Sequence, residues 1–370
     1  MIRVLSDKSK IHIGLIAGLA LSVTNACTTQ FGAHNVAPGA YDYNRSLALS
    51  QDQQLLLNLV RLRYRDTVMF LDIASITTQH SYSGAASLGS AFPFGGISGG
   101  NASPSTGLSY SETPTISYVP LKGEDFASKM LAPIPVQTLF LLAGSGWSIE
   151  RLLLCCVEQF GPLSNGPSAS GPTPVSVPDN RRFRVVASLL RQLQSEEKAI
   201  VELDTSNGKS DVYLRFRVPR DALSLELKSI LNLPANAERL LLGGKPSNGD
   251  LATLSSRSRS LLGALYALSH TIDIPFEHQD AGFVTSSHNT AGNTGDWEHF
   301  LGGLFDVKTS SEDPGAVFVK VKYRGHWFWI PNDDLNAKTS FSLLNFLLAL
   351  QSAGGQGKAP LLTISAAAGG

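Results

Sequence analysis

The chain has 370 residues, of which 43% are hydrophobic and 16% are charged, and its 30 Lys and Arg residues equal its 30 Asp and Glu residues. That hydrophobic content excludes a chain disordered throughout, and at roughly 150 residues per domain the length predicts two or three domains. The balanced charge excludes a global basic field that would hold nucleic acid, and 3 Cys exclude a disulfide framework. No Cys and His residues have the spacing of a zinc site, so the sequence predicts neither a metal nor a cofactor.

Residues 1–26 have the pattern of a secretory signal, with three basic residues before an apolar run too short to span a bilayer. The segment ends at Ala26, directly before Cys27, and here the chain resembles bacterial outer-membrane lipoprotein precursors. The resemblance implies that Cys27 is acylated and anchors the protein in membrane lipid, and that Thr28 in place of Asp selects the outer membrane. Thr24 departs from the aliphatic residue usual in this family, so cleavage by an ordinary signal peptidase, which leaves Cys27 free, is the alternative.

Residues 27–49 are expected to form a lipidated, polar tether. A mainly helical lobe, residues 50–161, is expected after it. Its first helix begins at a Ser50 cap and continues to about Arg65, because leucine and valine residues recur near helical spacing and Arg residues occupy the last turn.

The segment of residues 81–118 has the pattern of a long amphipathic β-hairpin. Aromatic or aliphatic residues alternate with small polar residues along both arms, and residues 95–106 form a turn rich in Gly, Ser and Asn. Glu112 is its only charged residue, and each arm exceeds the roughly 9 to 11 residues of a tilted transmembrane β-strand. The residues expected to face a membrane are Tyr82, Leu88, Phe92, Phe94, Leu108, Tyr110, Ile116 and Tyr118.

One hairpin alone leaves two open edges, which hydrocarbon does not tolerate, so insertion requires a ring of copies that closes one shared sheet. A lipidated subunit that donates one amphipathic hairpin resembles the curli-type secretion-channel lipoproteins, and the resemblance lies in this pattern. Pro93, Pro104 and Pro114 interrupt ladder bonding, so a soluble arm that forms oligomers and a disordered loop are the alternatives.

Further helices are expected between residues 123 and 160, the last of them at Arg151–Phe160 behind Ser148. Residues 162–178 contain five Pro with Ser and Gly and are expected to link this lobe to a second lobe, residues 179–370. In the second lobe we expect helices at 179–194, 223–231, 257–269 and 335–350, strands at 199–203, 212–218, 239–242, 316–323, 326–330 and 361–365, and a mobile loop at 279–296. Because strands and helices interleave without a βαβ period, the sequence predicts an α+β fold of two lobes with antiparallel strands.

The mature chain also resembles an uncharacterised set of bacterial lipoprotein-like sequences. The segments that carry this resemblance are Leu55–Thr77, Pro114–Pro135, Arg257–Ser269 and Lys322–Ser352. It implies a location in the bacterial envelope and implies no activity.

No set of residues predicts a catalytic site. Gly96–Gly100 has the letters of a nucleophile elbow, but Gly-rich turn residues flank it instead of a strand and a helix. Cys155 and Cys156 lie in an apolar helix and are expected to be buried, unreactive thiols. We therefore expect that the protein is not an enzyme.

Two further groups of residues are candidates for binding. His270, His278, His288 and His299 share a window with Asp280 and Asp296, but solvated loop residues explain this better than a metal cluster. Near the end, Trp327 and Trp329 share one face of a strand and, with Arg324, can contact a glycan or a partner. A half-buried core strand produces the same pattern and is favoured.

These patterns predict a membrane-anchored lipoprotein that faces the periplasm and is a structural subunit of a homo-oligomeric envelope ring or export channel. The alternative is a periplasmic binding or scaffold lipoprotein that recognises cell-wall glycan or an envelope complex. The expected partners are membrane lipid, further copies of the chain and other envelope proteins, without nucleic acid.

Overall fold

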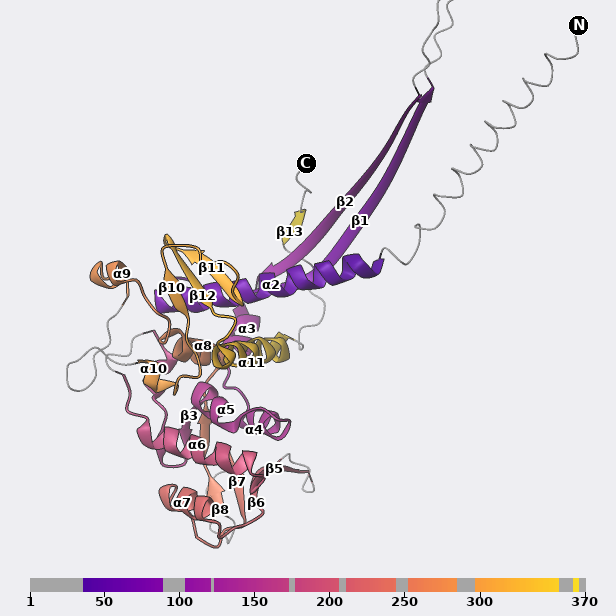
Figure 1. Ribbon diagram of the computed structural model, residues 1–370. Coiled ribbons are helices and arrows are strands. Elements are labelled where there is room, and N and C mark those ends of the chain that lie inside the picture. Colours follow the sequence, from indigo (N-terminus) through magenta and orange to yellow (C-terminus); the bar gives the residue numbers. More distant parts are fainter. Residues whose placement is uncertain are drawn as a thin grey trace, which may run out of the picture. The chain divides into compact units, whose positions relative to one another are not determined.

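The computed structural model describes residues 36–88, 104–120, 123–172, 177–205, 211–243, 252–284, 297–352 and 362–365 (Figure 1). Helices and strands interleave along the chain, and among the named strands only β7 and β8 pair in parallel. The α+β class predicted from the sequence is therefore confirmed. The chain divides into two compact units, Met1–Gln54 and Leu55–Gly370.

Most helices lie in the larger unit. Among the described residues, none of the helices combines the length and the hydropathy that a membrane span requires. They are α2 (Val36–Arg63), α3 (Gly123–Phe126), the π-helical turn η2 (Ala127–Leu131), α4 (Val136–Gly144), α5 (Ile149–Cys156), the 3-10 turn η3 (Pro167–Ser170), α6 (Arg181–Ser195), α7 (Ala222–Ile230), α8 (Leu261–Ser269), α9 (Phe276–Asp280), α10 (Trp297–Phe300) and α11 (Leu335–Ser352).

The strands form four separate sheets in the described part of the chain. Their orders are β1 (Leu71–Leu88), β2 (Pro104–Pro120), β13 (Leu362–Ser365); β4 (Leu163–Ser164), β3 (Val157–Phe160), β9 (Ser256–Ser258); β5 (Ala199–Asp204), β6 (Asp211–Phe216), β7 (Arg239–Leu242), β8 (Ala252–Leu254); and β10 (Lys308–Ser310), β12 (His326–Ile330), β11 (Val319–Tyr323).

Helix α2 begins at Val36, so residues 36–49, which we expected in a tether, are helical. Pro38 lies in the first turn, where backbone N–H groups have no helical acceptor, and it therefore removes no hydrogen bond. Most described side chains between residues 44 and 54 are exposed, whereas the part of α2 in the larger unit buries an apolar stripe. That stripe consists of Leu55, Leu56, Leu59, Val60 and Leu62.

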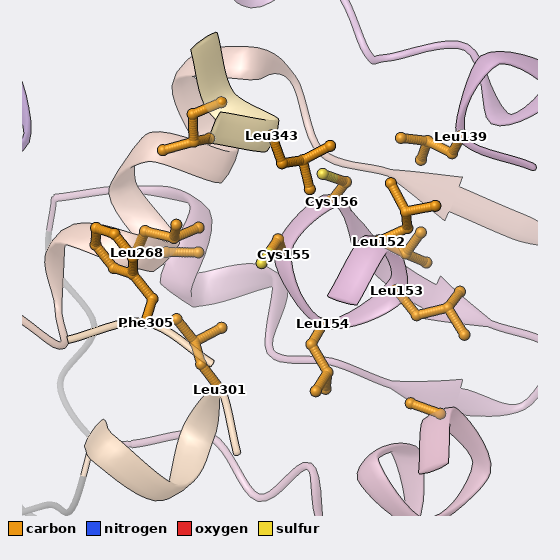
Figure 2. Packing of buried hydrophobic residues seen from close by; sticks show 14 of the residues in the cluster. Leu139, Leu152, Leu153, Leu154, Cys155, Cys156, Leu268, Leu301, Phe305 and Leu343 are labelled. Carbon is orange, nitrogen blue, oxygen red and sulfur yellow. The ribbon is translucent and has the colours of Figure 1, made fainter. Parts of the chain in front are cut away.

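Helix α5 lies in the hydrophobic core of the larger unit and packs against α6 and α8. The Ser148 side chain caps its N-terminus by accepting a hydrogen bond from the Arg151 backbone N–H. Figure 2 shows Cys155 and Cys156 pointing to different sides of the helix among leucine side chains. Both thiols are fully buried, and burial raises the pKa of Cys155 to about 11. The predicted burial is confirmed, and protonated thiols of this kind are poor nucleophiles.

Residues 162–178, expected to link two lobes, lie inside the compact unit of residues 55–370. The amide of the fully buried Asn165 donates hydrogen bonds to three backbone carbonyls at the C-terminal end of α5, at 2.8 to 3.3 Å. The equally buried Arg259 donates to the carbonyls of Asn165 and Gly166. The prolines limit regular structure here, but these buried hydrogen bonds hold Asn165 and Gly166 in the core.

Two expected helices are shorter because strand pairing replaces a terminal turn. Residues 157–160 form β3, which pairs with β9, so the helix before them ends at Cys156. The helix expected from Arg257 begins at Leu261, where the Ser260 hydroxyl accepts a hydrogen bond from the Gly263 N–H at 3.0 Å. Pairing between segments so distant in sequence leaves no mark in local periodicity.

Candidate functional site

The register of the β1–β2 hairpin aligns the alternating patterns of its two strands. Tyr82 lies opposite Tyr110, and Ser81 lies opposite Ser111. Residues directly opposite each other occupy the same face of a sheet. One face therefore collects the aromatic and aliphatic positions, and the other collects small and polar ones. The second face consists of the pairs Ser75–Ser117, Thr77–Thr115, Gln79–Thr113, Ser81–Ser111, Ser83–Ser109, Ala85–Gly107 and Ser87–Ser105.

A β-bulge and a third strand extend this two-faced pattern. The register shifts between Ile73 and Ser75, where β1 has one extra residue. Ile73 therefore lies opposite Tyr118 on the apolar face, although strict alternation would place it on the polar face. Strand β13 then pairs with β2, with Leu362 and Ile364 at apolar positions and its Thr and Ser at small polar positions. The two-faced pattern is therefore a property of the whole sheet.

The register places six of the eight residues predicted for a membrane face at positions on the same face of the hairpin. They are Tyr82, Leu88, Leu108, Tyr110, Ile116 and Tyr118. Phe92, Phe94 and the predicted lipidation site Cys27 lie outside the described residues.

The sheet of β10, β12 and β11 has one face in the core and one face outside it. Phe328 and Ile330 are fully buried and lie opposite Val321 and Val319. Trp327 lies opposite Lys322 and Ser310, and Trp329 lies opposite Lys320 and Lys308. The outer face therefore consists of two tryptophans flanked by lysines.

Both tryptophans of this outer face are half-buried, and neither packs against the main hydrophobic cluster of the described chain. The Lys320 ammonium lies 5.0 Å and the Lys322 ammonium 5.7 Å from the centre of the Trp327 ring. Such cations are attracted to the face of the ring. Phe328 of this strand therefore packs in the core. Trp327 and Trp329, for which a core role was favoured, lie outside the main hydrophobic cluster.

Arg324 lies in the turn between β11 and β12, away from the two tryptophans with which the sequence grouped it. Arg324 and Gly325 have φ values of 47° and 89°, as a two-residue hairpin turn with φ above zero at both central positions requires. The guanidinium donates to both carboxylate oxygens of Asp66, at 2.9 and 3.2 Å, and lies 5.4 Å from the centre of the Tyr64 ring. Its contacts belong to a different group of residues.

This group surrounds Tyr64, which follows the end of α2. The Tyr64 hydroxyl is 2.6 Å from Nδ1 of His278, and the His278 and His326 rings meet edge to face with centres 4.8 Å apart. The Nε2 atom of His326 is in turn 2.6 Å from a carboxylate oxygen of Glu277. We call Tyr64, Glu277, His278 and His326 the histidine cluster. Glu277, His278 and His326 are the one group of three His, Cys, Asp or Glu ligands found close together in the described chain.

Burial and neighbouring charges set the ionisation of the groups around Tyr64. Burial raises the pKa of Tyr64 to about 12, so the phenol stays neutral. Burial lowers the pKa of His278, and the adjacent His326 lowers it further. Burial alone would raise the pKa of Asp66, but hydrogen bonds from Tyr323 and Arg324 outweigh it and lower the pKa below its usual value.

The histidine window expected from the sequence is divided in the structure. His278 joins the histidine cluster, whereas His270 is 6% exposed and stacks on Trp297 with ring centres 4.4 Å apart. His299 is exposed, and His288 lies outside the described residues. The partner of His278 is His326, which the sequence pattern assigned only to an aromatic strand. No local signal joins the two, because the sheet and α9 bring them together across a long stretch of chain.

Comparisons with known proteins identify no relative of this chain. No family model, no curated protein and no solved structure matches this chain. The function is therefore argued from the hairpin, the tryptophan face and the histidine cluster alone.

Proposed function

We propose that the protein is a lipoprotein anchored through Cys27 on the periplasmic face of the outer membrane, and that its hairpin joins those of other copies in a homo-oligomeric ring that forms an export channel. The observation that carries this proposal is the hairpin register, which puts Tyr82 opposite Tyr110 and Ser81 opposite Ser111. A strand between lipid and an aqueous lumen needs this division into one apolar and one polar face.

The open edges of the sheet support the homo-oligomeric part of the proposal. In the described chain, β1 is an edge strand, and β13 pairs with only Thr115–Tyr118 of β2. Unpaired strand edges offer backbone donors and acceptors to a neighbouring chain. A second copy that adds its own β1 or β2 satisfies these groups, and a closed ring satisfies them in every copy.

The polar pair of His80 and Glu112 marks a boundary for the proposed membrane segment. His80 lies opposite Glu112, and the next pair on the same face is Tyr82 opposite Tyr110. Aromatic girdles lie at the membrane interface of transmembrane strands. No charged residue lies between Tyr82 and Glu112. Apolar residues alternate from Tyr82 to Phe94, and the length of this segment exceeds the roughly 9 to 11 residues that a tilted transmembrane strand needs.

The test places a charge on either face of the hairpin. Leu108→Lys is expected to abolish ring assembly and ion conductance in liposomes, because a lysine that faces lipid costs roughly 2 kcal/mol per copy. Ser109→Lys, the adjacent position on the polar face, is expected to assemble and to alter only ion selectivity. Full-length protein in mild detergent is examined by electron microscopy and by conductance measurements.

Two further variants separate this proposal from a soluble arm. Deletion of residues 84–111 is expected to leave a folded lipoprotein without channel activity, and Cys27→Ala is expected to release protein from the membrane when the hairpin is deleted. Equal tolerance of Leu108→Lys and Ser109→Lys, with full-length protein that stays monomeric, would contradict the channel.

A second candidate function rests on the tryptophan face. Trp327 and Trp329 lie outside the core beside Lys320 and Lys322, and aromatic rings with neighbouring cations suit a sugar ring that carries carboxylate groups. In this function the protein binds cell-wall glycan from its membrane anchor. The channel remains the first proposal, because the division into an apolar and a polar face extends over all three strands of the sheet of β1, β2 and β13.

This second function predicts a separation of binding from stability. Trp329→Ala is expected to reduce binding to purified peptidoglycan sacculi at least tenfold and to leave the thermal unfolding midpoint nearly unchanged. Phe328→Ala, one position earlier and fully buried, is expected to lower the free energy of unfolding by about 3 to 5 kcal/mol. If Trp329→Ala lowers stability as much as Phe328→Ala does, the ring serves only packing.

A further inference from the structure

We propose that Glu277, His278 and His326 bind one divalent transition-metal ion of the zinc class. This site is separate from the hairpin and goes beyond the proposed function. The two adjacent ligands on α9 and the third at the start of β12 belong to the same compact unit.

The three residues already hold their ligand atoms close to one another. One ligand atom from each lies within 4.8 Å of the others, and the Glu277 carboxylate and His326 Nε2 are 2.6 Å apart. Ligand atoms around a tetrahedral zinc, with bonds of about 2.0 to 2.2 Å, are separated by roughly 3.4 Å. The site therefore needs only small side-chain movements, and the Glu277 side chain, 67% exposed, is free to make them.

Tyr64 supplies the outer partner that a metal-binding histidine needs. Such a histidine uses one ring nitrogen for the metal and the other for a hydrogen bond that orients the ring. The Tyr64 hydroxyl occupies Nδ1 of His278 at 2.6 Å, which leaves Nε2 for the metal. Tyr64 is itself held by edge contacts with Tyr323 and Phe328, so the orientation of His278 is fixed by core residues.

His326 has a ring nitrogen that no protein group satisfies. Its Nε2 contacts Glu277, but its Nδ1 is buried and has no hydrogen-bond partner. Buried polar atoms without a partner are uncommon in proteins and usually indicate a missing ligand or water. A metal ion bound at Nε2 beside Glu277 leaves Nδ1 to a water molecule, which is the outer hydrogen-bond partner that a metal-binding histidine needs.

The donor set selects the class of metal. Two imidazoles and one carboxylate suit zinc and its transition-metal neighbours, whereas calcium and magnesium prefer oxygen ligands alone. Three protein ligands leave a fourth position for water, which the exposure of Glu277 makes accessible. The nearby Arg324 is paired with Asp66 through two contacts, so its positive charge is largely compensated.

The test measures metal uptake by the full-length chain in detergent after treatment with a chelator. Isothermal titration with Zn²⁺ is expected to show one equivalent bound per chain, and Co²⁺ is expected to produce the visible absorption of a tetrahedral site. His326→Gln and Glu277→Gln are expected to weaken Zn²⁺ binding more than tenfold. Tyr64→Phe, which removes no ligand, is expected to weaken it by about 10- to 100-fold through the loss of the outer partner.

Controls keep the test independent of folding and of surface binding. The exposed Glu277 side chain supplies a variant that leaves the core intact, and circular dichroism checks the fold of the others. His299→Gln removes an exposed histidine outside the cluster and is expected to bind Zn²⁺ normally. Absence of saturable Zn²⁺ uptake, or uptake that Glu277→Gln and His326→Gln leave unchanged, overturns the proposal. Neither result bears on the hairpin.

Discussion

Arg259→Met is expected to lower the free energy of unfolding by about 3 kcal/mol. The Arg259 guanidinium is fully buried and donates hydrogen bonds to the carbonyl oxygens of Asn165 and Gly166 and to the Ser170 hydroxyl. Met replaces the apolar stem but donates nothing, so these acceptors lose a donor inside the core, and each buried unsatisfied group costs about 1 to 3 kcal/mol. Relief of the burial of a charge offsets part of this loss. Urea denaturation followed by tryptophan fluorescence measures the change.

Arg257→Met is the matched control, two positions earlier in the same chain. Arg257 pairs with Glu158 at 2.9 Å, but its side chain is 57% exposed. Exposed ion pairs contribute between zero and about 1 kcal/mol, so a small change is expected. Equal losses in the two variants would show that Arg259 does not hold residues 165–170 in the core.

Stability is expected to fall by roughly 1.6 kcal/mol between pH 6.5 and pH 5 because of His270 alone. Burial lowers the pKa of His270 to about 3, and the positive charges of Arg63 and Arg259 lower it as well. The folded state therefore keeps the ring neutral while the unfolded chain binds a proton below its ordinary pKa of about 6.5. This contribution is fully present above pH 6.5 and is lost progressively as the pH falls toward 3.

The His270→Phe variant isolates this effect from other groups that titrate in acid. Phe retains an aromatic ring beside Trp297 but has no titratable nitrogen, so the slope of stability against pH should become shallower. His299→Gln, which changes an exposed residue, should retain the wild-type slope. Urea midpoints at pH 7, 6.5, 6 and 5 provide the comparison, and parallel curves for wild type and His270→Phe would contradict the assignment.

Local patterns predicted elements whose signal lies in neighbouring residues. The strand His326–Ile330 and the strand Arg239–Leu242 have the predicted bounds. In the first, a run of aromatic residues next to a turn is a short-range signal, and in the second the signal is a short apolar run. The helix predicted at 335–350 begins at Leu335, and the side chain of Asp334 directly before it accepts a hydrogen bond from the Ala337 N–H at 2.8 Å. Asp is among the preferred residues at a helix N-terminus, so the start of this helix has a local signal as well.

The sequence by itself determined the α+β class, the burial of the two cysteines and the alternation along the hairpin, because each depends on periodicity and composition within a short segment. Tertiary structure alone decided that residues 162–172 lie within the compact unit, where Arg259 donates a buried hydrogen bond to the Asn165 carbonyl. It also decided that His278 meets His326 and that Tyr82 lies opposite Tyr110. Contacts between distant segments depend on the register and packing of whole elements, and no single segment contains that information.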